Sequence, residues 1–228
     1  MVARDRRPHP SAPGSTRAWA PIVVLAIAGC FGAEATVFPP GLEPLEENLV
    51  APPDPQGGET ITILTGEAPD HQWAHGRGLL RVSPEDAWRA LKDPPVSSNS
   101  CDADTYDFDI QPDPAYELAY VAHYAVHSVI TVQWDTQWRF GTVLGAPAEP
   151  ELAIARYQKV YGSTAIDLIE GSFQLLAVDD APELTEVQLV DHLSAFGAGV
   201  ENIQEAMEYR FSVILAAVHG QATPSCPP

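Results

Sequence analysis

The longest periodic pattern in the chain runs from residue 116 to residue 140 and alternates apolar with polar side chains. Its even positions are mostly aromatic or aliphatic and its odd positions mostly polar, which is typical of a β-strand with one buried face. At about 3.3 Å per residue this segment would span roughly 80 Å, far more than an ordinary strand. It must therefore fold back, and we expect the turn around His127 and Ser128, where the even face is least apolar. Both arms keep the same parity, so the turn needs an odd number of residues or a bulge.

Five further segments have the composition of β-strands and are bounded by turn-forming residues. They are residues 60–64, 78–82, 152–161, 165–178 and 185–195. Gly171 lies inside the fourth segment and predicts a bulge there, because a glycine within a strand often marks such an irregularity.

Two segments predict helices. Ser83 offers a capping hydroxyl and Pro84 suits the first helical position, and the apolar stripe of this helix includes Trp88. A long amphipathic helix is expected near the C-terminus and should end at Gly220, a natural left-handed stop. Its apolar residues recur every three or four positions: Val200, Ile203, Met207, Phe211, Ile214 and Val218.

Short motifs follow one another along the chain in a recognisable order. They are Gly76-Arg77-Gly78, Ser83-Pro84-Glu85-Asp86-Ala87-Trp88, Gly171-Ser172-Phe173-Gln174-Leu175-Leu176 and Thr185-Glu186-Val187, with the C-terminal helix after them. Between residues 60 and 220 the chain resembles the START-like lipid-binding superfamily, which includes polyketide cyclases. The resemblance implies an α+β helix-grip fold, in which a curved antiparallel sheet wraps around the long C-terminal helix. It also implies a cavity between sheet and helix that accommodates an apolar ligand.

The even face of the 116–140 segment and the inward stripe of the last helix offer the wall that such a cavity needs. Aromatic rings and flexible apolar side chains commonly line ligand pockets. The expected lining residues are Tyr116, Tyr120, Tyr124, Trp134, Trp138, Phe140, Met207, Phe211 and Ile214. The same side chains would equally make a filled core, and the sequence leaves both interpretations open.

Arginines precede a short apolar run at the N-terminus. Residues 4–17 contain four arginines, and the apolar residues 18–29 are too few for a membrane span but suit a secretory signal peptide. The run ends in Ile27-Ala28-Gly29-Cys30, which resembles the bacterial lipobox. The alternatives are an ordinary secretory signal cut elsewhere and an uncleaved anchor helix.

Resemblance to bacterial lipoproteins implies diacylglycerol on Cys30, removal of residues 1–29 and acylation of the new amino terminus. Two or more acyl chains hold a protein stably on a membrane, whereas one chain does so only marginally. Phe31 follows the cysteine, where an aspartate would favour retention at the inner membrane. We therefore expect a lipid-anchored protein of the bacterial cell envelope, at the outer membrane.

Residues 30–58 are rich in proline, glycine and glutamate and show no sustained period. Repeated prolines favour extended, semi-rigid chain, so we expect a tether that holds the folded domain off the membrane rather than packing into it. The helix-grip domain is expected over residues 59–221 and a short tail over residues 222–228.

Acidic residues dominate the charge of the chain, with 31 Asp and Glu against 12 Lys and Arg. Removal of residues 1–29 takes away four arginines and Asp5, which leaves eight basic and 30 acidic residues. Nucleic acid binding needs clustered basic side chains, so no nucleic acid partner is expected. The same charge repels anionic lipid surfaces, so the acyl anchor rather than a basic face should hold the protein on a membrane.

Two cysteines remain once Cys30 is lipidated. In an oxidising envelope Cys101 and Cys226 are candidates for one disulfide, which would close a long loop and contribute up to about 4–5 kcal/mol in the chain-entropy model. Two unpaired thiols are the alternative, because Cys226 lies in a proline-rich tail.

Histidines occur in pairs at a spacing that binds zinc on a helix, but we predict no metal or cofactor. His123 and His127 lie on the expected strand, where residues four apart are about 13 Å from each other, too far to share an ion bound at about 2 Å. His71 and His75 lie in a polar segment that lacks a convincing third ligand.

One pair of ionisable residues points to a polar pocket. By parity Asp191 lies on the apolar face of its strand, and Arg210 lies close to the inward stripe of the last helix. Buried ionisable groups are candidates for function, although structural ion pairs produce the same pattern. The motifs of serine hydrolases and β-lactamases are missing from the sequence, so we predict no catalytic residue.

These patterns predict a lipid-anchored envelope protein that binds an apolar small molecule or lipid without catalysis. One alternative is a structural or protein-interaction lipoprotein with a filled core. The other is a cyclase-like enzyme, which requires Asp191 and Arg210 to converge inside the cavity.

Overall fold

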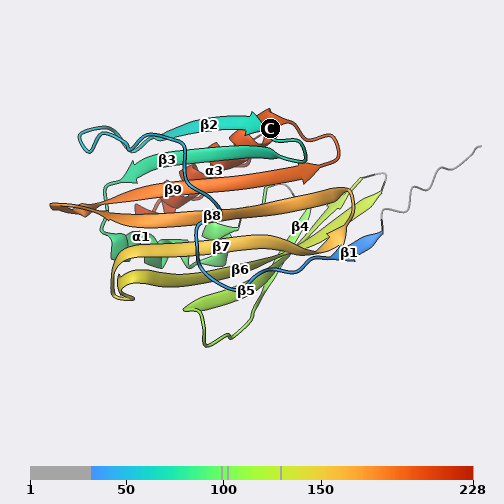
Figure 1. Ribbon diagram of the computed structural model, residues 1–228, viewed down its shortest axis with the longest axis horizontal. Helices are drawn as coiled ribbons and strands as arrows, with labels where there is room; N and C mark the ends of the chain where they lie inside the picture. The colour runs from blue at the N-terminus through green and yellow to red at the C-terminus, as the bar shows by residue number, and fades with distance from the viewer. Residues whose placement is uncertain (1–31, 99, 102, 129, 228) are drawn as a thin grey trace, which may run out of the picture. The chain divides into compact units, whose positions relative to one another are not determined.

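A single antiparallel sheet forms most of the structure, a computed structural model that describes residues 32–227 except 99, 102 and 129 (Figure 1). The strands are β1 (Ala33–Ala35), β2 (Ile61–Glu67), β3 (Gln72–Leu80), β4 (Thr105–Ile110), β5 (Leu118–His127), β6 (Thr131–Ala146), β7 (Glu149–Ser163), β8 (Ile166–Val178) and β9 (Ala181–Ala195). The helices are α1 (Pro84–Leu91), α2 (Pro94–Ser97) and α3 (Val200–Val218).

The strands follow the order β2-β3-β9-β8-β7-β6-β5-β4, and β1 pairs with the end of β7. The helices pack on one face of this curved sheet, which we call the inner face (Figure 1). A curved antiparallel sheet around a long C-terminal helix is the helix-grip arrangement, so the predicted α+β fold class is confirmed.

The long alternating segment forms the β5–β6 hairpin, as predicted. His127 pairs with Thr131, which leaves an odd, three-residue connection at residues 128–130. Tyr120 therefore lies opposite Trp138, and Tyr124 lies opposite Trp134, all on the inner face.

Both predicted helices are confirmed in position. The backbone amide of Asp86 donates to the Ser83 hydroxyl at 3.2 Å, and Pro84 occupies the first helical position of α1. After α3 the backbone of Gly220 is left-handed, with φ of +61°. The sequence did not predict β4 and α2, and β3 begins at Gln72, well before the expected residue 78.

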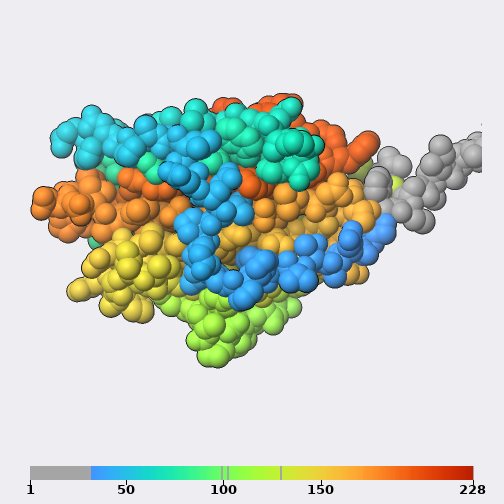
Figure 2. Space-filling view, in the orientation of Figure 1, coloured from blue at the N-terminus to red at the C-terminus, as the bar shows by residue number. Residues whose placement is uncertain are grey.

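The predicted tether is wrong in one respect, because it packs against the domain. Residues 36–50, here called the strap, cross the outer face of the sheet, and Figure 2 shows them as a blue band over the strands. Phe38 and Val50, which belong to the strap, are buried. Proline-rich chain makes few hydrogen bonds of its own, and this segment makes them with the sheet instead.

Side chains and backbone of the sheet hold the strap along its length. The side-chain amide of Asn48 donates to the backbone carbonyls of Gly76 at 2.9 Å and Leu189 at 3.1 Å. The Leu45 backbone amide donates to the Ser172 hydroxyl at 3.0 Å. These contacts tie the strap to β3, β9 and β8.

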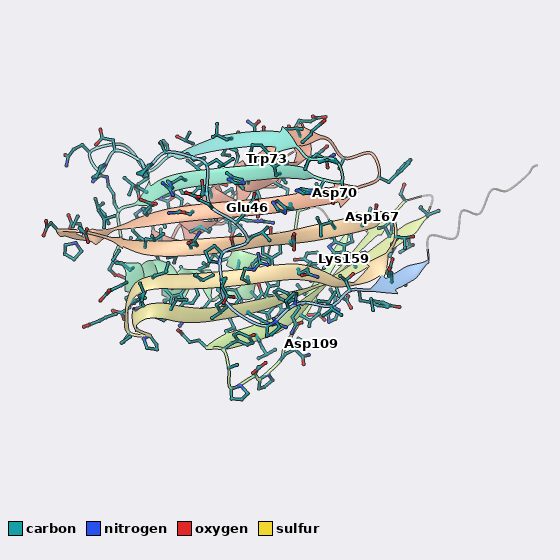
Figure 3. All side chains as sticks on the ribbon, viewed as in Figure 1. Glu46, Asp70, Trp73, Asp109, Lys159 and Asp167 are labelled. Atoms are coloured by element: carbon teal, nitrogen blue, oxygen red, sulfur yellow. A yellow bond between two sulfur atoms is a disulfide. The ribbon has the colours of Figure 1, made fainter. Side chains whose placement is uncertain are left out.

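Glu46 pins the strap between two histidines of the outer face (Figure 3). The Leu49 amide donates to Nδ1 of His75 at 2.9 Å, so Nε2 of His75 carries the proton and donates to Glu46 at 2.6 Å. Nε2 of His192 lies 3.1 Å from Glu46, and its Nδ1 lies 3.2 Å from Glu170. With both ring nitrogens facing carboxylates, His192 is arranged as an imidazolium.

Burial and hydrogen bonding act oppositely on the pKa values of this contact. Burial alone would raise the pKa of Glu46, but the hydrogen bonds from His192 and His75 outweigh it and lower the pKa. Burial alone would lower the pKa of His192, but the bonds to Glu170 and Glu46 outweigh it and raise the pKa. The ring of His71 packs against that of His192 in a tilted arrangement, with the ring centroids 4.3 Å apart. Asp70 in turn bonds His71 at 2.9 Å.

We expect the strap to be held most firmly between about pH 4.5 and pH 6.5, the ordinary pKa values of the two groups. Glu46 loses its charge as pH falls through its lowered folded pKa, and His192 loses its charge as pH rises through its raised folded pKa. Hydrogen–deuterium exchange of the amides at residues 45–50, expressed as protection at each pH, measures this. Glu46→Gln should lower the protection and flatten its pH dependence, whereas Glu47→Gln, at the exposed neighbour, should change neither. Equal behaviour of the two variants would contradict the role of Glu46.

Candidate functional site

A buried polar triad lies between the inner face and α3. Asp191 comes from β9, Tyr157 from β7 and Arg210 from α3. The Tyr157 hydroxyl donates to Asp191 at 2.5 Å. One guanidinium nitrogen of Arg210 donates to Asp191 at 2.6 Å and to the Tyr157 oxygen at 2.7 Å. The predicted pair of Asp191 and Arg210 thus converges, and all three residues are more than nine-tenths buried.

Strand parity and one glycine make room for the triad. Asp191 shares the inner face of β9 with Leu189, and its backbone pairs with Gly171 on β8. A Cβ at Gly171 would lie 2.4 Å from the Tyr157 oxygen. The predicted bulge at Gly171 is wrong: pairing with both neighbouring strands continues through this residue, which instead lets the tyrosine approach.

Burial and neighbouring charges keep Tyr157 and Arg210 each in one protonation state near neutral pH. Burial raises the pKa of the Tyr157 phenol well above its ordinary value, and the charge of Asp191 raises it further, against the opposing effect of Arg210. Burial would lower the pKa of Arg210, but Asp191 and Tyr157 outweigh it and raise the pKa. The phenol therefore keeps its proton and the guanidinium its charge.

Arg210 retains a donor that the triad does not use. Its Nε is buried and has no hydrogen-bond partner among the described residues. The guanidinium also lies 5.2 Å from the ring centroid of Tyr157 and 5.3 Å from that of Phe173. A buried donor without a partner costs free energy, so a ligand that brings an acceptor would gain by meeting it.

The triad lines a cavity of about 90 Å³. The other lining residues are mostly apolar and include Tyr124, Trp134, Thr136, Trp138, Ile169, Leu193, Ile203 and Ala206. The Trp138 ring stacks on Tyr157 with centroids 4.2 Å apart, and the Trp134 ring stacks on Tyr124 at 5.0 Å. The cavity therefore has aromatic walls and one polar, charged end.

A surface groove of about 360 Å³ adjoins this cavity. The two spaces share Trp134, Ile169, Leu193 and Ala206 in their linings. The groove is further lined by Cys101, Ile166, Ala195, Asn202, Glu205, Tyr209 and Pro227. The inner cavity has room for a small polar group, and the groove alone falls within the range of about 300–1,000 Å³ typical of ligand pockets.

Only part of the predicted lining faces the cavity. Tyr124, Trp134 and Trp138 line it, together with the predicted polar pair Asp191 and Arg210. Met207, Phe211 and Ile214 instead fill the core around α3, and so do Tyr120 and Phe140 on the sheet. The Trp88 ring of α1 packs on Phe140 at 5.8 Å, and Ser97 of α2 bonds the Tyr120 hydroxyl at 2.8 Å. The helices α1 and α2 therefore occupy space that we had predicted, from the sequence, to hold the ligand.

Tyr116 lies on the outer side of the sheet, so its assignment to the cavity wall is wrong. Its hydroxyl accepts the Gly41 amide of the strap at 3.2 Å. The guanidinium of Arg139 lies 5.3 Å from its ring centroid. Tyr116 precedes β5, so the strand alternation does not extend to it.

The sequence missed Tyr157, the central residue of the triad. Parity within the predicted strand 152–161 places it on one face with Ala153 and Ala155, which was a usable signal. Ile154 is also buried, on the outer face, so this strand lacks the simple alternation that would have identified its inner side.

Cys101 and Cys226 form a disulfide, with their Cα atoms 5.4 Å apart. The bond attaches the C-terminal tail beside the groove, where Pro227 also contributes to the lining. Cys30, the predicted lipidation site, and the predicted signal segment lie outside the described residues. Within the part of the chain that the structure covers, no helix has the length and apolarity needed to cross a bilayer.

Three of the four paired histidines lie on strands, His71 lies in the connection between β2 and β3, and neither pair converges on an ion. His75 is buried in β3, not in a polar loop, and His123 and His127 both belong to β5. Across the described residues, histidine, cysteine and acidic side chains form no group of three able to hold a metal ion.

No protein-family model and no curated protein sequence matches the chain. Its structure is similar to several solved structures. Human StAR-related lipid transfer protein 5 is 10% identical with a TM-score of 0.48, and the match covers 72% of this chain and 83% of that one. The lipid transfer and protein localization domain of human StarD13 is 8% identical with a TM-score of 0.47, covering 77% and 88%. The ZhuI aromatase/cyclase from Streptomyces sp. R1128 is 14% identical with a TM-score of 0.43, covering 66% and 92%.

These likenesses are too weak to carry any ligand or reaction over to this chain. The helix-grip assignment rests on the chain's own strand order and on α3.

Gly171→Ala should lower the free energy of unfolding by about 1–3 kcal/mol, the usual cost of overpacking a core. The new methyl group would meet the Tyr157 ring, which Trp138 and Arg210 hold in place. Urea denaturation measures the change. Gly58→Ala is the matched control, because the nearest atom to its added Cβ is 3.9 Å away. Equal stability of the two variants would contradict the close approach.

Arg210→Met should destabilise the protein by about 3–5 kcal/mol, because it leaves the buried carboxylate of Asp191 without its cation. Replacing the whole triad, as Tyr157→Phe, Asp191→Leu and Arg210→Met together, should recover most of that loss. Thermal and urea unfolding report both changes. If Arg210→Met alone were as stable as the parent, the three residues of the triad would not be energetically coupled.

Proposed function

We propose that the protein binds an apolar small molecule or lipid between the sheet and α3, without catalysis, while anchored to a bacterial envelope membrane through Cys30. The observation that supports binding is the aromatic cavity of about 90 Å³, which ends at the triad and adjoins the larger groove. The lipobox-like sequence before Cys30 supports the anchor, and Phe31 favours the outer membrane.

The cavity suits one class of ligand, an elongated apolar molecule with a hydrogen-bond acceptor at one end. The acceptor would meet Nε of Arg210, which has no partner among the described residues. The apolar body would lie against Trp134 and Ile169 and extend into the groove. A hydroxyl, carbonyl or carboxylate group satisfies this requirement.

A cyclase-like activity has one observation in its favour, the convergence of Asp191, Tyr157 and Arg210. The same contacts nevertheless favour ligand binding over catalysis. Asp191 is already paired with both partners, and the raised pKa of Tyr157 keeps the phenol protonated, so neither is a free base near neutral pH.

Uptake of Nile red, an uncharged apolar dye with a carbonyl acceptor, tests the proposal. We expect saturable binding by the purified full chain, seen as a rise in dye fluorescence. Ala206→Phe should weaken it at least tenfold, because Ala206 lines both the cavity and the groove. Glu208→Phe, exposed on the same helix, is the matched control and should bind like the parent.

Two further measurements decide between the proposed and the alternative functions. Organic extracts of the protein purified from its host membranes should contain a stoichiometric apolar compound. No bound compound, together with no dye uptake, would favour a filled core and a structural role. Chemical conversion of the extracted compound that Tyr157→Phe abolishes would favour an enzyme.

A further inference from the structure

The groove opens at one end of the sheet, between two turns. Ile166 follows the β7–β8 turn and Ala195 ends β9, and both line the groove. We use the name open end for the connections at this end of the sheet: the β7–β8 turn (residues 164–165), the loop between β9 and α3 (residues 196–199), and Ser128 and Ile130 between β5 and β6. Figure 1 shows β1 beside the same end of the sheet.

The part of the chain that the structure describes begins at the open end. The Thr164 amide donates to the Gly32 carbonyl at 3.0 Å, and Ala33 pairs with Ser163. Pairing of β7 with β8 ends at Gln158, which leaves the edge that β1 occupies. Position 30 is two residues before Gly32, a chain length of about 7 Å. A group attached at position 30 is therefore covalently confined to the neighbourhood of the groove.

Two large apolar side chains at the open end have high solvent exposure. Phe196, next to the groove-lining Ala195, is 87% exposed. Ile130, in the β5–β6 turn, is 42% exposed. A large exposed aromatic at a turn is costly in water and gains free energy in an apolar phase.

The charges near the open end suit zwitterionic lipid, which has no net charge, better than anionic lipid. Glu34, Asp167 and Glu205 are acidic and lie on or beside it. Lys159 is buried, and its amino group donates to the carbonyls of Ser163 and Ile166 (Figure 3). The described residues of the open end and of β1 include no exposed cation, so nothing there attracts anionic headgroups.

We propose that the open end is the surface through which the protein rests on a bilayer of zwitterionic lipid, with the groove facing the acyl chains. This inference builds on the proposed function, because it assumes the anchor at Cys30 and an apolar ligand. In this orientation the β6–β7 turn lies at the far end from the bilayer. A ligand enters the groove from the membrane without crossing water.

Photolabelling from within the bilayer tests the orientation. The full chain is reconstituted into phosphatidylcholine vesicles that contain a phospholipid with a photoreactive acyl chain, and labelled peptides are mapped. We expect labels on peptides that contain residues 163–166 and 196–199 and none on residues 146–149. Phe196→Ser should reduce labelling of its loop roughly tenfold, since a phenylalanine ring contributes strongly to transfer. Val143→Ser, exposed near the other end, is the matched control and should label like the parent.

The outcomes separate this inference from the proposed function. Labels at residues 146–149, or equal labels at both ends, would overturn the orientation even if dye binding is intact. A vesicle-bound chain without any label would also overturn it, as would a chain that remains unbound to the vesicles. Labels confined to the open end in a protein that takes up no dye would support the docking surface and remove the binding function.

Discussion

The contact among Asp191, Tyr157 and Arg210 determines how α3 sits on the sheet. A carboxylate and a guanidinium are costly to bury in an apolar core unless they form an ion pair. Asp191, Tyr157 and Arg210 can make their contacts only when β7, β9 and α3 keep this one alignment relative to one another. A slip of one residue in β9 would turn Asp191 to the outer face and leave Arg210 unpaired. The cavity and its aromatic walls therefore depend on the same contact that gives the cavity its polar end.

The local alternation of apolar and polar residues predicted most strands and helices, whereas contacts between residues far apart in the sequence determine which of them enclose the cavity. The β5–β6 hairpin was predictable because residues with one buried face alternate over both arms. Asp191 was found because it breaks an apolar face, and Arg210 because it lies beside an apolar stripe. Tyr120 and Phe140 have the same parity as Trp138 but pack against α1 and α2, whose positions no strand pattern reveals.

The strap shows what composition leaves out. Proline and glycine correctly indicated a segment without regular structure, but not its hydrogen-bond partners, which lie between 26 and 146 residues away along the chain. The outer face carries His75, His192 and Arg139, and the polarity of these side chains does not reveal that another segment of the chain covers them. The outer face is a surface matched to an acidic, extended segment of the same chain.

The strap also has a mechanical consequence. Tension applied at residue 32 first loads β1 and then the strap's contacts, which are spaced along the chain and break one after another. Their loss frees fifteen residues, whose fully extended length is about 50 Å, before force reaches the seven paired residues of β2. When the domain is pulled by its N-terminal attachment, the strap thus detaches and lets the chain extend while α3 and the groove keep their shape.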